Sequence, residues 1–331
     1  MSLRIALIGL GRRGMKTLRR YAYVPGAEIV LLCDTDRSAV PEDCARLPFT
    51  TDWREACRAD VDLVYICTPW DTHASMACYA MEAGRHVAVE VPAATTIEEC
   101  WQIVETSRRT GRHLLLTENC CYDLFHLETL ERVRAGLLGE LTHLEGAYIH
   151  PLESDESEWM RQSYLAHGGN PYPTHAFGPV CQLLGNDRPA TLVSLTGKNG
   201  INTTLVRTES GVSVMLALDV FTPGRPYSRL QTVCGTRGFV QKYPVPTVCA
   251  EGEWNRHAPL IELWHEGHRR GVPNEMNYVM DCRMVEALVE GRRPDFDAAD
   301  AALWSSIAPL SRLSARQGGR PVDIPDFRRP R

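Results

Sequence analysis

A dinucleotide-binding fingerprint near the start of the chain restricts the possible fold more than any other feature. Gly9-Leu10-Gly11-Arg12-Arg13-Gly14 has the spacing G-x-G-x-x-G, follows an apolar run at residues 4–8 and precedes a helical pattern. In this context the first glycine permits a tight turn and the second lets the backbone approach a pyrophosphate. The third permits close packing of helix on strand. The segment therefore predicts a strand–turn–helix unit whose helix N-terminus holds the phosphates of a dinucleotide.

The cofactor preference is indicated by Asp34, which ends the second predicted strand twenty residues after Gly14. A carboxylate at this place binds the ribose 2′-OH of NAD and repels the 2′-phosphate of NADP. Arg37 lies nearby and weakens this preference without reversing it. We therefore expect NAD as the cofactor.

Thr68-Pro69-Trp70 ends a third apolar run, where open α/β sheets bind ligands. Trp70 has two open interpretations, because it can border the dinucleotide or cover the core. His73 follows in the first turn of a predicted helix. It contacts the cofactor or is bonded to nearby backbone.

The order of elements predicts two domains. Residues 1–120 alternate short apolar runs with helical patterns, which indicates a Rossmann-type, doubly wound parallel sheet that binds NAD. Later strands follow one another without intervening helices. Residues 121–331 therefore predict an α+β substrate-binding domain with an open, mostly antiparallel sheet and C-terminal helices. We expect residues 151–173, which are polar, to form a long loop.

Composition limits the partners and the compartment. The chain has 331 residues and a net charge of −5, which gives no electrostatic reason to expect nucleic acid. No apolar run approaches the ~20 residues that span a bilayer, and the first strand leaves no room for a signal peptide. Twelve scattered cysteines without a C-x-x-C predict reduced thiols and a cytoplasmic protein. His265 and His268 lack companions at metal-ligand spacing, so we expect no metal.

A phenol and an imidazole lie three residues apart in Asn170-Pro171-Tyr172-Pro173-Thr174-His175. Imidazole and phenol groups can both transfer protons in catalysis. The segment leads into a predicted helix, so His175 by itself is better explained as a helix-terminal histidine satisfied by backbone, whereas the surrounding motif favours a catalytic role. The pair is a candidate catalytic site.

The segment Val87-Ala88-Val89-Glu90-Val91-Pro92 resembles the glucose-fructose oxidoreductase / inositol dehydrogenase / MocA family. Most dehydrogenases of that family carry Glu-Lys-Pro here, and the lysine assists hydride transfer at a sugar hydroxyl. Val91 replaces that lysine. A valine cannot donate, accept or relay a proton, which weakens the ordinary dehydrogenase interpretation.

Further segments resemble one branch of this family, glycoside hydrolase family 109. They are Glu90-Val91-Pro92, Asn119-Cys120-Cys121-Tyr122, Tyr148-Ile149-His150, residues 169–175 and Arg225-Pro226-Tyr227. The resemblance implies tightly held NAD and cleavage of N-acetylhexosaminides, notably α-N-acetylgalactosaminides. It implies a sugar pocket with Arg161, Tyr227 and Glu90. It also places Glu90, Val91 and Asn119 beside the cofactor, and nominates His175, Tyr148 and Tyr172 for proton transfer.

The implied reaction is redox-neutral. Oxidation of C3 to a ketone makes the C2 proton acidic, a base removes it, the aglycone leaves from C1, water adds and C3 is reduced again. Two alternatives remain open: a dehydrogenase acting on a sugar or cyclitol, with His175 in place of the lysine, and a non-catalytic NAD-binding regulator. Members of the family commonly associate through the sheet, which implies a homo-oligomer.

Overall fold

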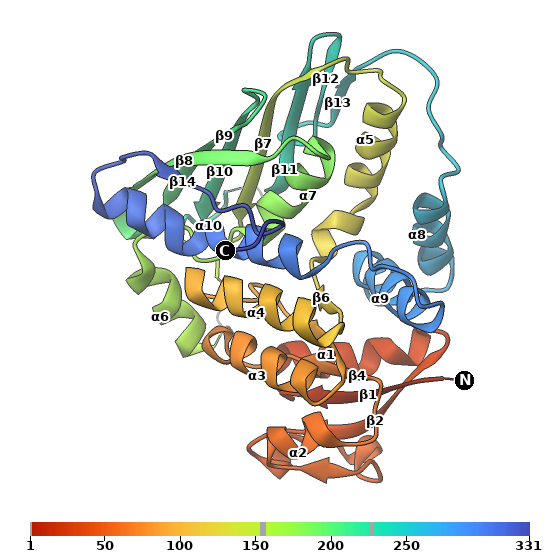
Figure 1. Cartoon of the computed structure of the whole chain (residues 1–331). Coiled ribbons are helices and arrows are strands. Elements are labelled where there is room, and N and C mark those ends of the chain that lie inside the picture. The colour runs from red at the N-terminus through yellow and green to blue at the C-terminus, as the bar shows by residue number, and fades with distance from the viewer. Residues whose placement is uncertain (1, 153–156, 226–227) are drawn as a thin grey trace. The chain divides into compact units, whose positions relative to one another are not determined.

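The computed structural model describes residues 2–152, 157–225 and 228–331 (Figure 1). The described chain divides into two compact units. Unit 1 contains residues up to Thr117, His265–Leu303 and Phe327–Arg331, and unit 2 contains Glu118–Trp264 and Trp304–Asp326. The division differs from the expected domains, 1–120 and 121–331, because two late segments cluster with the N-terminal unit.

Unit 1 is built on a six-stranded sheet in which every pairing is parallel. The spatial order is β3 (Phe49–Thr50), β2 (Ala27–Cys33), β1 (Leu3–Ile8), β4 (Leu63–Ile66), β5 (His86–Val89) and β6 (Leu114–Leu116). This is the strand order of a dinucleotide-binding Rossmann sheet, with its reversal beside β1. The predicted N-terminal fold is confirmed.

The helices of unit 1 are α1 (Arg12–Arg20), α2 (Trp53–Arg58), α3 (Trp70–Glu82), α4 (Ile97–Thr110), α9 (Glu275–Val289) and the first part of α10 (Ala298–Arg316). Short 3-10 turns lie at η1 (Tyr21–Tyr23), η2 (Arg37–Ala39) and η3 (Glu42–Cys44). The clearest local signals bound α4: Thr96 and Glu99 form a capping box, and Gly111 ends the helix with φ +67°.

Unit 2 is built on an eight-stranded sheet. Its order is β13 (Thr247–Cys249), β12 (Gly238–Gln241), β11 (Ser228–Gly235), β7 (Leu141–Ile149), β10 (Ser213–Asp219), β9 (Asn202–Thr208), β8 (Pro189–Thr196) and β14 (Val322–Asp323). β7 and β10 are parallel and the other neighbours are antiparallel. The predicted mostly antiparallel sheet is confirmed, and β9 alternates strictly between buried and exposed residues.

The helical part of unit 2 contains α5 (Leu124–Arg134), α6 (Glu158–His167), α7 (Thr174–Leu184), the 3-10 turns η4 (Asn119–Tyr122) and η5 (Lys198–Gly200), and the rest of α10. Helix α8 (Pro259–Arg269) spans the boundary between the units. A Cβ atom at Gly146 would meet the Ala176 carbonyl oxygen at 2.5 Å. Because Gly146 has no side chain, α7 lies directly against β7.

The expected loop at residues 151–173 contains α6, so this prediction was wrong for that stretch. Helix α6 begins after Ser157, ends at Gly168 with φ +73°, and buries only Tyr164. A helix that buries one residue shows no apolar stripe in the sequence. No helix in the described part of the chain is long and apolar enough to cross a bilayer.

Candidate active site

The glycine-rich turn has the form that a dinucleotide requires. Gly9 has φ +92°, and a Cβ atom on it would lie 2.7 Å from the Cys67 carbonyl oxygen. A Cβ atom on Gly14 would lie 1.8 Å from the Gly9 carbonyl oxygen. At Gly11 the corresponding position has no atom within 4 Å. The first and third glycines are therefore needed by the fold, and the second leaves the space through which a pyrophosphate approaches the backbone.

Asp34 is held against this turn. Its Oδ2 accepts a hydrogen bond of 2.6 Å from the Leu10 N–H, and its Oδ1 accepts one of 3.1 Å from the Asp36 N–H. A carboxylate has about four acceptor sites, so Asp34 retains capacity for a ribose hydroxyl. The residues present fit NAD.

The strand-end segment Thr68-Pro69-Trp70 begins α3, with Pro69 at its N-cap and Trp70 only 8% exposed. His73 is fully buried, and its two ring nitrogens lie 2.7 Å from the Thr68 carbonyl oxygen and 2.8 Å from that of Pro92. Of its two interpretations, bonding to nearby backbone is the one found. His73 therefore links the loop after β4 to the loop after β5 through hydrogen bonds to their backbone.

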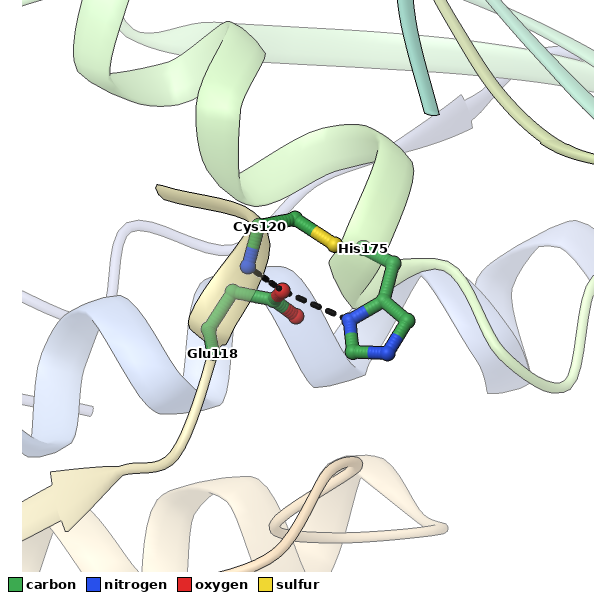
Figure 2. A group of neighbouring side chains, drawn as sticks. All are labelled: Glu118, Cys120 and His175. Carbon is green, nitrogen blue, oxygen red and sulfur yellow. Dashed lines mark hydrogen bonds and ion pairs between the residues drawn. The ribbon is translucent and has the colours of Figure 1, made fainter. Parts of the chain in front are cut away.

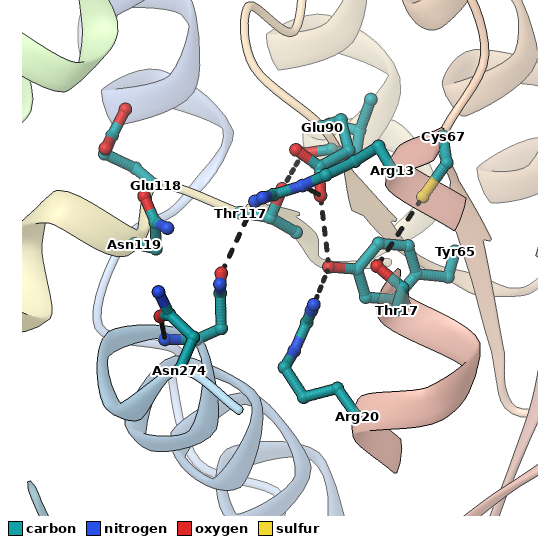
Figure 3. Close-up of polar contacts among 12 residues, drawn as sticks. Arg13, Thr17, Arg20, Tyr65, Cys67, Glu90, Thr117, Glu118, Asn119 and Asn274 are labelled. Carbon is teal, nitrogen blue, oxygen red and sulfur yellow. Dashed lines mark hydrogen bonds and ion pairs between the residues drawn. The ribbon is translucent and has the colours of Figure 1, made fainter. Parts of the chain in front are cut away.

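Arg13 belongs to the predicted cofactor-binding segment, and its side chain forms an ion pair with Glu90. Its Nε donates a 2.8 Å hydrogen bond to Glu90 Oε1, and its guanidinium lies 3.4 Å from Asn277 Oδ1 (Figure 3). Arg12 lies exposed on the first turn of α1. Burial alone would lower the pKa of Arg13, but Glu90 raises it above the usual value. The Arg13 side chain thus forms an ion pair, while its backbone is part of the glycine-rich segment. Glu90 is buried, and Val91 is 2% exposed.

In unit 2, His175 and Glu118 form a short polar contact. His175 lies in the first turn of α7, and its Nδ1 is 2.6 Å from Oε1 of the fully buried Glu118 (Figure 2). The Tyr172 hydroxyl lies 3.4 Å from His175 Nε2. A carboxylate accepts only, so Nδ1 carries the proton and Nε2 accepts from Tyr172.

Glu118 remains ionised in this arrangement. Burial would raise its pKa, but His175 and hydrogen bonds, including one from the Cys120 N–H, lower the pKa below its ordinary value. Sequence reasoning missed Glu118. A carboxylate two residues beyond the buried strand β6, at the carboxyl edge of the sheet, was the available signal.

Tyr148 brings a second phenol to the same cluster. It lies near the end of β7, with its ring centroid 4.9 Å from that of Tyr172 and 5.6 Å from that of His175. The guanidinium carbon of Arg229, on β11, lies 4.2 Å from the Tyr148 ring centroid. The structure therefore assembles Tyr148, Tyr172 and His175 as expected, and adds Glu118 and Arg229.

The remaining predicted residues are placed less directly. Arg161 is half-buried on α6, one turn before Tyr164, whose ring centroid is 6.2 Å from that of Tyr172. Asn119 is buried in η4, and its Oδ1 lies 3.6 Å from the Cys120 thiol sulfur. Tyr227 lies outside the described residues.

Within the described ranges, Glu118, Cys120 and His175 form a group whose potential metal-ligand atoms all lie within 4.8 Å of one another (Figure 2). Burial raises the pKa of the Cys120 thiol well above its usual value, which disfavours the thiolate that metals bind. We interpret the group as a hydrogen-bonded Glu–His pair beside a thiol. The absence of a metal stays a prediction.

The two parts of the chain match two family models. Residues 3–118 match the oxidoreductase family with an NAD-binding Rossmann fold. Residues 122–200 and 195–331 match the C-terminal domain of glycosyl hydrolase 109. The chain therefore carries an NAD-binding domain, which confirms the cofactor prediction.

Relatives that match nearly the whole chain are consistent with these two family models. The chain is 44% identical to an alpha-N-acetylgalactosaminidase of Bacteroides fragilis, over 99% of this chain and 92% of that protein. It is 40% identical to a glycosyl hydrolase family 109 protein of Phocaeicola vulgatus, over 99% and 95%. A levoglucosan dehydrogenase solved with NADH and L-sorbose shares the fold, with a TM-score of 0.81 at 19% identity over 99% and 100%. The chain belongs to glycoside hydrolase family 109.

Proposed function

We propose that the protein is an NAD-dependent, redox-neutral glycosidase that cleaves N-acetylhexosaminides, with α-N-acetylgalactosaminides as its first candidate substrates. One observation carries the proposal: the 44% identity over nearly the whole chain to an alpha-N-acetylgalactosaminidase. The Glu118–His175–Tyr172 chain and the neighbouring Tyr148 support it, because they supply proton-transfer groups.

When bound, NAD supplies the acceptor for the C3 hydride and the donor that restores it. The residues Gly9, Gly11, Gly14 and Asp34 would hold it. The protein's own residues must then handle two protons, one from the C3 hydroxyl and one from C2.

His175 is the proposed acceptor of the C3 hydroxyl proton. Its Nδ1–H is fixed by Glu118, so Nε2 is the basic nitrogen, and the Glu118 carboxylate stabilises the imidazolium that forms. This role replaces that of the lysine whose place Val91 takes. Because Val91 is buried and apolar, that position has no group that can transfer a proton.

Tyr148 is the proposed base for C2. A proton beside a ketone is weakly acidic, and a phenolate is a stronger base than imidazole, since their ordinary pKa values are about 10 and about 6.5. Tyr172 would donate to His175, and Arg161, Tyr227 and Glu90 remain proposed substrate contacts. Paired carboxylates at the glycosidic bond, used by most glycosidases, are not required for this elimination.

The test uses the purified protein with no cofactor added, nitrophenyl N-acetyl-α-galactosaminide and deuterated water. We expect release of nitrophenol, deuterium at C2 of the sugar and no accumulation of reduced nicotinamide. Tyr148→Phe should abolish incorporation of deuterium, whereas Arg207→Met, on the exposed face of β9, should not.

Two outcomes would contradict the proposal. Reduced nicotinamide that accumulates with free sugar and added NAD would indicate a dehydrogenase. Bound NAD without either reaction would indicate a regulator.

We also propose a homo-oligomer through the sheet of unit 2. Leu195 on β8 and Leu205 on β9 are 64% and 49% exposed, which is costly for apolar side chains in water. Leu205→Glu should reduce the mass measured by light scattering if this face is the interface. A reducing, cytoplasmic location is supported by the twelve free cysteines, and cell fractionation tests it.

A further inference from the structure

Arg229 lies beside Tyr148 at an irregularity in the pairing of β7 with β11. In the pairing of β7 with β11, Ile149 lies opposite Ser228 and Gly146 opposite Leu230. Two residues of β7, Ala147 and Tyr148, therefore face the single residue Arg229, which is the two-against-one pattern of a β-bulge. Bulges redirect side chains and are frequent beside active sites. This one places the guanidinium 4.2 Å from the Tyr148 ring centroid.

Water screens the positive charge of Arg229 only weakly, because this side chain is buried. Arg229 is 8% exposed. A guanidinium does not lose its proton in proteins, so this position holds a permanent positive charge. The same charge opposes the effect of burial on the Cys120 thiol, whose pKa is nonetheless raised.

Other titratable groups around Tyr148 come from each neighbouring element. They are His150 just after β7, Tyr164 on α6, Tyr172 and His175 at α7, Glu118 before η4, and Asp219 on β10. The pKa of Tyr164 is raised, first by burial and then by Tyr148 and Tyr172, so it stays a neutral phenol. Glu118 is bound to His175, and Asp219 Oδ2 is bound by Arg225 at 2.8 Å. Among the described residues, Arg229 places its guanidinium over the Tyr148 ring.

We propose that Arg229 is a positioning residue that stabilises the phenolate of Tyr148, and so keeps this tyrosine ready to take the C2 proton. The inference rests on the proposed glycosidase function. An opposite charge within about 4–6 Å favours the charged form of an acid by about 1–3 pH units. A cation over the ring face also attracts the π electrons of the neutral tyrosine, but the attraction to a full negative charge is stronger.

The step balances as follows. The phenolate oxygen forms a bond to the C2 hydrogen of the 3-keto sugar, and the C2–H bond breaks. The electron pair of the C2–H bond forms the C1–C2 double bond. The C1–O bond breaks, and the aglycone leaves with the electron pair of that C1–O bond and takes a proton from solvent. Tyr148 becomes a neutral phenol, and the charge of Arg229 is unchanged throughout.

The first measurement follows kcat/KM against pH for the NAD-containing protein with the nitrophenyl substrate. In Arg229→Met we expect the acid limb to move upward by about 1–2 pH units. Activity at pH 7 should then fall about 10- to 100-fold and recover at higher pH. Arg229→Lys should shift the limb less, because it keeps the charge. A fall by the same factor at every pH would mean that Arg229 is only structural, and would overturn the proposal.

The second measurement does not depend on turnover. The difference in ultraviolet absorbance between the protein and its Tyr148→Phe variant, followed with pH, reports the ionisation of Tyr148. We expect its midpoint below the ordinary ~10 of tyrosine, and higher in Arg229→Met or, if that variant does not fold, in the equally uncharged Arg229→Gln. An unmoved midpoint overturns the proposal. A moved midpoint in a protein without glycosidase activity would sustain the pairing of Arg229 with Tyr148 and reject the proposed function instead.

Discussion

At the scale of single residues, Glu118 decides the protonation of His175. The carboxylate accepts at 2.6 Å from Nδ1 and makes Nε2 the basic atom. The same arrangement orients the histidine of other proton-transfer sites, where it fixes the tautomer and stabilises the charged ring. Neighbouring side chains thus set which atom of His175 can react.

We predict that Glu118→Gln lowers kcat about 10²- to 10⁴-fold, because an amide can donate to Nδ1 and so favour the wrong tautomer. Bound NAD, measured after denaturation of the purified protein, should remain. Glu140→Gln, at an exposed position of the same unit, is the matched control. Equal activity in both variants would show that the Glu118–His175 contact has no part in catalysis.

The glycine turn offers a second residue-scale prediction. Gly11→Ala should fold normally, because its Cβ meets no atom within 4 Å, but should lose bound NAD. Gly14→Ala should lose NAD and also about 1–3 kcal/mol of stability, because its Cβ collides with the Gly9 carbonyl oxygen. NAD content and urea unfolding check the pair. NAD retained in Gly11→Ala would argue against pyrophosphate binding at this turn.

At the scale of elements, a buried ion pair joins α1 to α9 within unit 1. The Arg20 guanidinium binds the Asp281 carboxylate. It also lies 3.3 Å from the Tyr65 hydroxyl, and Tyr65 approaches Glu90 at 3.5 Å (Figure 3). Burial raises the pKa of Asp281, and Arg20 opposes that rise. The chain Arg20–Tyr65–Glu90–Arg13 continues toward the glycine turn. The late helix α9 is therefore tied to the start of the Rossmann fold.

Arg20→Met should lower the free energy of unfolding by about 3–5 kcal/mol, since it leaves the buried Asp281 without its cation. The double variant Arg20→Met/Asp281→Leu should regain most of this loss, because it removes both charges from the apolar interior. Urea unfolding followed by circular dichroism measures both. A double variant no more stable than the single one would refute this account of the pair.

At the scale of the whole molecule, the buried His126 and the half-buried His167 couple stability to pH. Burial lowers the pKa of His126 and of His167 to about 4. His126 is held at 2.6 Å by Gln182, and cationic arginines on α10 act on His167. Unfolded histidine titrates near ~6.5, so the unfolded chain binds protons first as the pH falls.

Stability should therefore be complete above pH ~6.5 and decline as the pH falls toward about 4, by roughly 2–3 kcal/mol for the fully buried His126 and by less for the half-buried His167. Urea unfolding at a series of pH values measures the decline. His126→Gln, which can still bond to Gln182, should decline less over this range. An identical decline in the variant would exclude His126 as a source.

Much of the fold could be predicted, for identifiable reasons. The alternation of strands and helices in residues 1–120 could be predicted, because continuous apolar runs and helix-capping residues act locally. Helix α6 was missed because a single buried residue leaves no periodic pattern. Of the site, the Tyr/His motif and the glycine turn were found, since each lies within a few consecutive residues.

The cofactor class, the two sheet types and the family are properties of short segments, so the order of residues alone was enough to determine them. The partners of the reactive groups are different. Glu118 meets His175 across 57 positions of the chain, and Arg229 meets Tyr148 only because a β-bulge pairs two strands unevenly. Charge acts through space rather than along the backbone. Only the folded chain could therefore bring Glu118 to His175, which fixes the tautomer, and Arg229 to the ring of Tyr148.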